Sequence, residues 1–292
     1  MKPPIQSLAD ALERDERLDP IAERISAAFD RAVSPGPVKD LLSGTWFGHA
    51  LHPPLTAVTI GAWTGAGVLD VLGNEDGADA MVGFGVLSAL PTLATGLNEM
   101  ADTSGRSKRI AIAHGLANIA VTSTFALSWL ARKTGHRGLG RLLAMLGGAA
   151  VGMTAALGGH LSFVKGVGVN ETAFERPRDR WTPAMPESEL SEGTSAHATV
   201  DGIDILLYRS PERIYALSNR CTHRGGPLHR GPVQATGQMP TVTCPWHGSM
   251  FRLEDGSIVR GPATAPEPAF EVRINEGQIE VRPIFHTGGV GG

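Results

Sequence analysis

Four long runs of uncharged residues constrain the fold of this chain more than any other feature. They contain 17, 19, 22 and 23 residues and occupy residues 53–69, 80–98, 110–131 and 142–164. About 20 apolar residues in a helix span the hydrocarbon core of a bilayer. A helix at the surface of a soluble protein normally presents a charged face, which these runs lack. We therefore predict an all-α bundle of four transmembrane helices.

The uneven distribution of charged residues indicates more than one domain. Residues 53–164 contain 13 charged residues in 112, whereas the other 180 residues contain 42. The apolar runs are rich in Gly and Ala, and Gly148 and Gly152 have the spacing that lets two helices approach closely in a membrane. A buried bundle in a soluble protein is the alternative, because Gly and Ala are only weakly hydrophobic on insertion scales.

Composition also excludes several classes of protein. With 42% hydrophobic residues and a formal net charge of −3, the chain is neither disordered nor charged for binding nucleic acid. Its two cysteines exclude a disulfide-rich scaffold. Residues 1–48 mix acidic and basic side chains and lack the apolar core of a signal peptide. We interpret them as a polar helical segment.

Basic residues in the loops predict how the bundle is oriented in the membrane. Four spans place both ends of the bundle on one side, and basic residues favour the cytoplasm. One side carries eight basic residues: Lys39, Arg106, Lys108, Arg109, Lys165, Arg176, Arg178 and Arg180. The other carries four: Arg132, Lys133, Arg137 and Arg141. We expect a multi-pass protein of the cell inner membrane with both ends in the cytoplasm.

Four histidines, His49, His52, His114 and His160, are expected near the membrane surface that carries both ends of the bundle. His114 is the fifth residue of its run and His160 is the fifth from the end of the next, so both lie about 7 Å deep. His52 precedes the first run. Ionisable residues inside spans are candidates for function. They could hold the iron of haem b, contact a quinone head group, or simply bond to neighbouring backbone.

The remainder of the chain predicts an all-β domain behind a linker. Turn signals at Asp201-Gly202, Asp255-Gly256 and Glu276-Gly277 are flanked by β-forming residues. Prolines interrupt any helix just before this region. The expected organisation is 1–48 polar helical segment, 49–165 membrane bundle, 166–186 linker, 187–285 β domain and 286–292 flexible tail.

Two short Cys/His motifs in this domain point to a metal site. Cys221-Thr222-His223 is followed, 20 residues later, by Cys244-Pro245-Trp246-His247, and these are the only cysteines. Zinc takes the same types of ligand, but zinc fingers place two cysteines together and then two histidines. A two-iron cluster with both cysteines on one iron and both histidines on the other requires one Cys–His pair on each of two loops.

These residues, with Gly225-Gly226-Pro227-Leu228 after the first motif and Gly248-Ser249 after the second, resemble the Rieske iron–sulfur family. The resemblance implies a small antiparallel β-sandwich that holds a [2Fe-2S] cluster at the tips of two loops. Cys221 and Cys244 would bind the buried iron, and His223 and His247 the outer iron. Gly261-Pro262 resembles the proline loop that packs over the cluster.

Departures from the respiratory members of that family concern the reduction potential. The chain has no extra cysteines for their disulfide, and Phe251 replaces their tyrosine, whereas Ser249 can keep one hydrogen bond to the cluster. Hydrogen bonds to cluster sulfur raise the potential. We expect a value in the lower or middle part of the Rieske range of about −150 to +300 mV. In these departures the sequence is closer to the ferredoxins of aromatic-ring dioxygenases.

The apolar block also resembles a family of bacterial four-helix membrane domains with a His-Pro pair at the first span, here His52-Pro53, which sometimes occur fused to Rieske domains. Nothing in the chain resembles an oxygenase iron site or a nucleotide-binding loop. We therefore expect a membrane-anchored electron-transfer protein without a substrate site of its own. It would exchange single electrons between a cytoplasmic cluster and a quinone, a haem or a partner redox protein.

The alternative is a membrane-tethered ferredoxin-like or redox-sensing module that serves a separate soluble oxygenase or reductase. In both hypotheses the partners are the lipid bilayer and a redox partner, and no nucleic acid is involved. The sequence does not predict the physiological donor and acceptor, the direction of electron flow or the oligomeric state.

Overall fold

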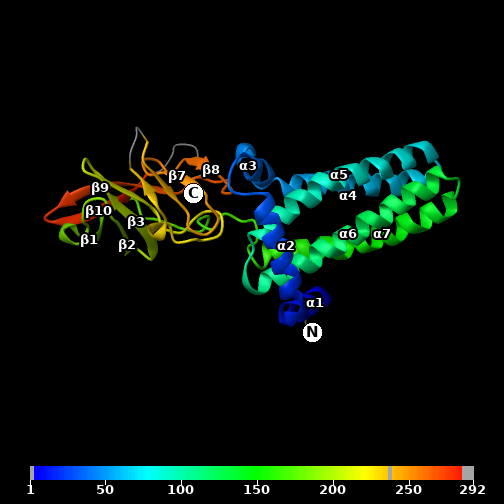
Figure 1. Cartoon of the computed structure of the whole chain (residues 1–292), viewed down its shortest axis with the longest axis horizontal. Helices are drawn as coiled ribbons and strands as arrows, with labels where there is room; N and C mark the ends of the chain where they lie inside the picture. The colour runs from blue at the N-terminus through cyan, green and yellow to red at the C-terminus, as the bar shows by residue number, and fades with distance from the viewer. Residues whose placement is uncertain (1–2, 236–238, 285–292) are drawn as a thin grey trace. The chain divides into compact units, whose positions relative to one another are not determined.

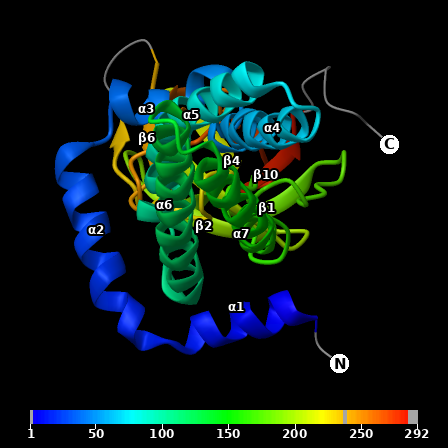
Figure 2. The ribbon, with the colours of Figure 1, turned by 90° about the vertical axis from the view of Figure 1, so that its right-hand side faces the viewer.

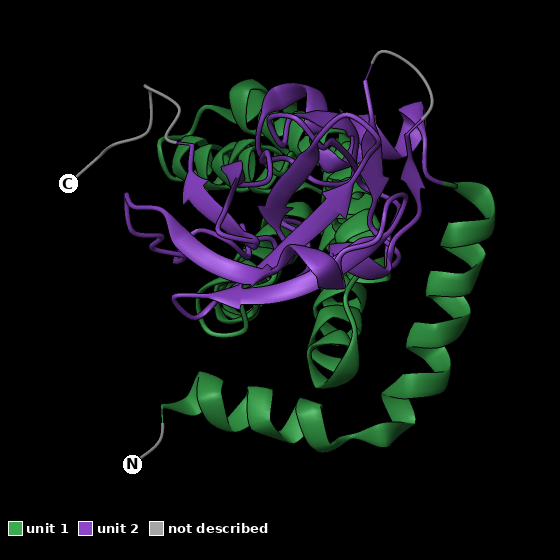
Figure 3. Ribbon diagram, turned by 90° about the vertical axis from the view of Figure 1, so that its left-hand side faces the viewer, with its two compact units in different colours: residues 1–34, 50–167 green, residues 35–49, 168–292 purple. Residues whose placement is uncertain are grey.

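The computed structural model describes residues 3–235 and 239–284, and the chain forms two compact units (Figures 1 and 3). Residues 1–34 and 50–167 form the helical unit, and residues 35–49 and 168–292 form the β unit. The tail predicted at 286–292 lies outside the described residues. An N-terminal helical region and a C-terminal β domain are therefore confirmed as the fold class.

Four long antiparallel helices form the bundle of the helical unit. They are α4 (His52–Val71), α5 (Glu75–Ala101), α6 (Gly105–Lys133) and α7 (Arg137–Phe163). Each helix contacts the next, and α4 also contacts α7, so the four helices close a ring. Asn74 begins α5 by accepting a hydrogen bond from the Gly77 backbone N–H at 3.0 Å.

Three of these helices are long and apolar enough to cross a membrane, and the predicted count of four is not confirmed. They are α5, α6 and α7, with 27, 29 and 27 residues. In the described part of the chain, α4 does not belong to this set. It has 20 residues, and its first turn contains His52 and two prolines while Asp70 lies near its end. These polar positions shorten its apolar run.

The polar segment predicted at 1–48 divides between the two units. Helices α1 (Pro4–Arg14) and α2 (Asp19–Ala32) belong to the helical unit, where α1 contacts α6 and α7 and α2 contacts α5 and α6 (Figure 2). Helix α3 (Pro37–Ser43) belongs to the β unit. The segment is helical, as predicted, but it does not form a separate body.

A stacked aromatic pair fills the middle of the bundle. The rings of Trp63 on α4 and Phe125 on α6 lie 4.0 Å apart and are almost parallel. Gly85 on α5 makes room for this pair, because a Cβ at that position would lie 2.3 Å from Trp63 Nε1. Gly85 thus allows close helix packing, whereas nothing lies within 4 Å of the Cβ positions of Gly148 and Gly152, the pair whose spacing predicted close approach.

Replacing Gly85 with alanine should destabilise the protein by about 1–3 kcal/mol, because the added methyl group forces the stacked Trp63 ring to move. Thermal unfolding in detergent measures this effect. Gly152→Ala on α7 is the matched control, because nothing lies within 4 Å of its Cβ position. Alanine favours a helix over glycine, so this control should be neutral or slightly stabilising. Equal unfolding temperatures for the two variants would contradict the packing argument.

The β unit contains two antiparallel sheets. The six-stranded sheet has the order β1-β10-β9-β4-β3-β2, and the four-stranded sheet has the order β5-β6-β7-β8. The strands are β1 (Thr182–Pro186), β2 (Ser195–Val200), β3 (Ile203–Arg209), β4 (Ile214–Ser218), β5 (Val233–Gln234), β6 (Thr241–Thr243), β7 (Met250–Arg252), β8 (Ile258–Arg260), β9 (Ala269–Asn275) and β10 (Gln278–Pro283). All three predicted turns join paired antiparallel strands.

Strand β1 begins the β domain earlier than predicted, inside the range 166–186 that was interpreted as a linker. Its Thr182 pairs with Val281 of β10. Its prolines are compatible with a strand because β1 lies at the edge of the sheet, where a missing backbone N–H costs no ladder bond.

The two sheets share a core that continues into the Cys/His loops. Strand β3 is buried on both faces, and its residues alternate between two clusters, with Leu206 in one and Ile205 in the other. The cluster of Leu206 includes Val242 and Phe251 of the four-stranded sheet, together with Cys221 and Cys244. The sandwich core therefore supports the cysteine side chains directly.

Candidate metal centre

Two loops with the same backbone geometry hold the predicted ligands. In each loop the cysteine N–H donates to the carbonyl five residues later: Cys221 to Gly226 at 3.0 Å, and Cys244 to Ser249 at 2.7 Å. In each loop a glycine four residues after the cysteine donates back to the cysteine carbonyl. Both glycines have a positive φ, 72° in Gly225 and 79° in Gly248, which favours glycine at these positions.

The four side chains form two pairs of donors. The thiols of Cys221 and Cys244 are buried and within hydrogen-bonding reach of each other. The rings of His223 and His247 are half-buried, with centroids 5.1 Å apart and planes nearly perpendicular. A Cβ at Gly226 would lie 2.7 Å from Cys244 Sγ, so only glycine fits beside this sulfur. The structure brings together all four residues predicted from the motifs.

This donor set fits two irons better than one zinc ion. Among the described residues, no group of three or more His, Cys, Asp or Glu side chains is placed to hold a single metal ion. Structural zinc requires four such ligands on one ion, whereas a Rieske cluster requires a sulfur pair and a separate nitrogen pair. Burial, aided by the nearby Arg224 and His247, holds the pKa of His223 well below its usual value. The imidazole is therefore neutral, the form that binds metals.

Ser249 is oriented by the segment that follows Gly261-Pro262. It is fully buried, and its Oγ accepts a hydrogen bond from the Ala263 backbone N–H at 2.9 Å. Its own hydroxyl proton therefore remains for another acceptor. Phe251 is fully buried in the core and offers no hydroxyl. The hydrogen bond from Ser249 to the cluster stays a prediction.

Ser249→Ala should lower the midpoint potential of the cluster while leaving the cluster assembled. A hydrogen bond to a charged group contributes about 1.5–3 kcal/mol, which corresponds to roughly 60–130 mV for one electron. Redox titration followed by electron paramagnetic resonance measures the change. Ser210→Ala, in the β3–β4 turn, is the control, because its hydroxyl bonds only locally to Arg213. An unchanged midpoint potential in Ser249→Ala would show that the Ser249 hydroxyl does not raise the potential of the cluster.

A segment far upstream in the sequence contacts these loops inside the β unit. Asp40 Oδ1 on α3 accepts a hydrogen bond from the Gly261 N–H at 2.9 Å, and Thr45 Oγ1 donates to the Ala263 carbonyl at 3.0 Å. Pro35 lies against Gly248. Burial raises the pKa of Asp40. We call residues 35–49 the strap, and no motif in the sequence indicates these contacts.

Glu267 is a second residue that the sequence does not single out. It is buried, and its Oε1 accepts a hydrogen bond from the Thr222 backbone N–H at 2.7 Å, between Cys221 and His223. Burial raises the pKa of Glu267 well above its usual value. Glu267 thereby fixes the turn that presents the first Cys–His pair.

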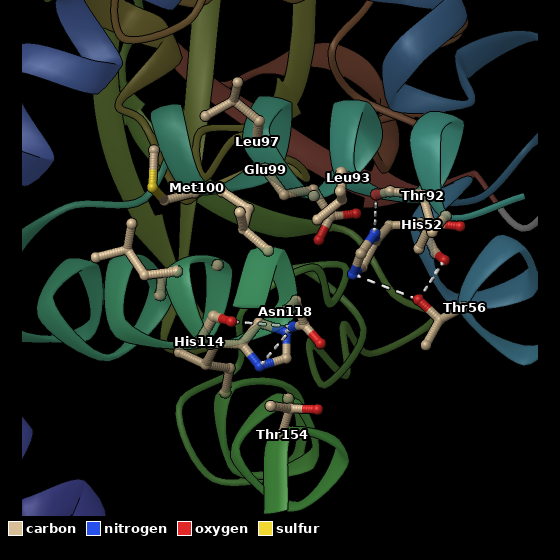
Figure 4. A pocket seen from close by; sticks show the side chains of 18 of the residues that line it. His52, Thr56, Thr92, Leu93, Leu97, Glu99, Met100, His114, Asn118 and Thr154 are labelled. Carbon is tan, nitrogen blue, oxygen red and sulfur yellow. Dashed lines mark hydrogen bonds between the residues drawn. The ribbon is translucent and has the colours of Figure 1, made fainter. Parts of the chain in front are cut away.

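The histidines of the helical unit are only partly brought together. His52 at the start of α4 and His114 on α6 line one cavity (Figure 4). His160 on α7 is buried, does not line this cavity, and has no hydrogen-bond partner for Nε2 among the described residues. The prediction grouped His52, His114 and His160 at one surface, and the structure brings only His52 and His114 to the same cavity.

The fold and the paired Cys/His loops define an iron–sulfur domain of the Rieske class. Residues 180–276 match the Rieske [2Fe-2S] domain, and residues 48–171 match the family described as "Predicted membrane protein (DUF2231)". The chain contains both domains, as the two resemblances imply.

The proteins described next are similar to the β domain of this chain. Ferredoxin CarAc of Metapseudomonas resinovorans is 28% identical over 102 residues, which are 35% of this chain and 92% of that protein. The ferredoxin component of the naphthalene 1,2-dioxygenase system of Pseudomonas putida is 26% identical over 102 residues, which are 35% of this chain and 94% of that protein. The solved ferredoxin of carbazole 1,9a-dioxygenase from Nocardioides aromaticivorans is 26% identical, with a TM-score of 0.33, over 36% of this chain and 98% of its own.

Proposed function

We propose that this chain is a membrane-anchored one-electron carrier. The observation that carries the proposal is the pair of equivalent loops, which presents two sulfur donors and two nitrogen donors as separate pairs. A [2Fe-2S] cluster bound there would supply reversible one-electron transfer. Homology of the domain to ferredoxin components of dioxygenase systems supports electron transfer.

The residues of the site have distinct tasks in this proposal. Cys221 and Cys244 hold the buried iron inside the sandwich core, where water is excluded. His223 and His247 hold the outer iron as neutral imidazoles. The Ser249 hydroxyl would donate a hydrogen bond to the cluster and so raise its reduction potential, whereas Phe251 has no hydroxyl and would make no such bond. We therefore expect a midpoint potential below about +250 mV, within the lower or middle part of the Rieske range.

The test uses the full chain purified in detergent. We expect iron and acid-labile sulfide at about two each per chain, and a rhombic Rieske resonance signal that appears on reduction. Titration should show the uptake of one electron per cluster. A protein that binds one zinc ion and takes up no electron would overturn the proposal.

In this proposal the helical unit anchors the chain in the membrane. It also binds the redox partner, a quinone or a haem, with which the cluster exchanges electrons. Apolar helices α5, α6 and α7 support insertion in the cell inner membrane, with α4 as a fourth span. The basic loops favour a cytoplasmic β unit. Protease added to intact cells should then leave the segment near Arg178 uncut, and cleavage there would reverse the orientation.

The electron partner is a quinone, a haem or another redox protein in this proposal, and the alternative is a tethered module that serves a soluble enzyme. The double variant His114→Ala/His160→Ala separates the two. Loss of quinone-linked reduction of the cluster supports exchange within the membrane, and unchanged reduction supports the tether. A reduced-minus-oxidised spectrum tests haem b, which would add sharp, intense bands to the broad, weak bands of the cluster.

A further inference from the structure

The bundle encloses a cavity of about 370 Å³ in one half of its length. It is lined by the first half of α4, the second half of α5, the first half of α6 and the second half of α7. These halves meet at the end of the bundle where the second segment of the helical unit begins at Ala50 and ends at Val167. The volume lies within the range of pockets that bind small organic molecules, about 300–1,000 Å³.

The lining is mainly apolar, with two polar groups and, in addition, the carboxylate of Glu99 and the hydroxyls of Thr59 and Thr122. Ile60, Leu93, Leu97, Leu116 and Ile119 contribute apolar surface. His52, Thr56 and Thr92 from α4 and α5 form one polar group, and His114, Asn118 and Thr154 from α6 and α7 form the other (Figure 4). Such a cavity fits an aromatic ring with polar substituents, and it suits a simple acyl chain less well.

The hydrogen bonds of His52 determine which of its nitrogens faces a ligand. Its Nδ1 lies 3.0 Å from the Thr92 backbone carbonyl, which can only accept, so Nδ1 carries the proton of the neutral ring. Nε2 is then an acceptor. The single proton of Thr56 is donated to the His52 carbonyl at 2.9 Å, while Nε2 is 3.5 Å from the same hydroxyl. The Nε2 lone pair is therefore available to a hydroxyl group in the cavity.

Two glycines leave the space that the two histidine rings occupy at the cavity wall. A Cβ at Gly96 on α5 would lie 2.8 Å from His52 Cε1, and a Cβ at Gly158 on α7 would lie 3.1 Å from His114 Cε1. Asn118 Nδ2 lies 3.0 Å from His114 Nε2 and so supports the second ring. The positions of both rings are thus fixed by helix packing and by hydrogen bonds.

We propose that this cavity binds the ring of a membrane quinol, with His52 Nε2 accepting the hydrogen bond of one ring hydroxyl. The proposal deepens, and rests on, the proposed function, because a quinol is a lipid-soluble electron donor in the membrane where the carrier is anchored. The apolar walls match the ring and the first part of its tail. The polar groups on the two sides of the cavity match hydroxyl substituents on opposite sides of a ring.

The test measures binding of decylubiquinol to the purified full chain by isothermal titration calorimetry in detergent. We expect His52→Ala and Gly96→Ala to weaken binding about tenfold, the second because its methyl group displaces the His52 ring. The dimethyl ether of the same ring, which has no hydroxyl proton, should also bind about tenfold more weakly to the wild type. His136→Ala is the matched control, because this exposed histidine precedes α7 at the other end of the bundle and should leave the affinity unchanged.

Three results would overturn the proposal. Equal affinities for the quinol and its ether would indicate a cavity that takes only apolar chains. Equal affinities in wild type, His52→Ala and Gly96→Ala would exclude His52 from the site, and the ether comparison remains informative if His52→Ala fails to fold. Sharp haem bands in the purified protein would assign the histidines to haem. The Rieske signal is recorded in every sample, so loss of quinol binding with an intact, reducible cluster separates failure of this inference from failure of the proposed function.

Discussion

Cys244→Ser abolishes the Rieske resonance signal and lowers the iron content from about two per chain to nearly zero. This result is expected because the serine oxygen is a much poorer ligand for iron in such clusters than a thiolate. The two cysteines are the only ones in the chain, so no neighbouring thiol can take over. Iron analysis and low-temperature resonance spectra of the purified variant measure the loss.

A conservative change in the same loop is the control for this prediction. Trp246 lies between Cys244 and His247, and 55% of its surface is exposed. Trp246→Phe should therefore retain iron and signal near the wild-type level. If Cys244→Ser also retained both, the assignment of the sulfur pair would be wrong.

Arg132→Ala should lower the free energy of unfolding by about 3–5 kcal/mol, because it removes the buried guanidinium that two largely buried carboxylates share and leaves them the more exposed Arg137 and Arg141. The Arg132 side chain on α6 is completely buried. Its Nη1 donates to Asp70 Oδ1 on α4 at 2.9 Å and lies 3.3 Å from Asp79 Oδ1 on α5. Removal of the guanidinium leaves two largely buried carboxylates close together. Chemical denaturation in detergent micelles measures the change.

Two further variants distinguish charge from side-chain volume. Arg141 also contacts Asp70, at 3.2 Å, but its side chain is 40% exposed, so Arg141→Ala should cost only about 0–1 kcal/mol. The triple variant Arg132→Met/Asp70→Asn/Asp79→Asn removes the buried charges together and should recover most of the stability lost in Arg132→Ala. If the triple variant is as unstable as Arg132→Ala, packing and not charge explains the effect.

The features predicted correctly from the sequence depend on local signals. The Asp201-Gly202 turn is encoded by adjacent residues, and two motifs of three and four residues contain the four side chains that the structure brings together, whose role as ligands stays a prediction. Uncharged runs likewise locate the long helices. The count of four spans is not confirmed, because the limits of an uncharged run do not weigh His52 and the two prolines in the first turn of α4.

The features that the sequence does not reveal depend on contacts between distant residues or on helix rotation. Asp40 meets Gly261 across 221 positions, and Glu267 meets Thr222 across 45. Counting residues gives the depth of His114 and His160 in the bundle, because rise per residue is constant. The direction in which each ring points depends on how the helices are rotated against one another, and that rotation brings His52, not His160, to the cavity of His114.

The strap makes the Rieske domain of this chain inseparable from the sequence before the first long helix. The polypeptide passes from one unit to the other three times, after residues 34, 49 and 167. A gene fragment that encodes residues 168–292 would therefore yield a ferredoxin-sized protein whose Gly261 N–H and Ala263 carbonyl have lost Asp40 and Thr45. Recombination that exchanges only the C-terminal part for a free-standing ferredoxin would break the same bonds. Residues 35–49 thus precede the first long helix in the sequence but belong structurally to the unit that presents the two Cys/His loops.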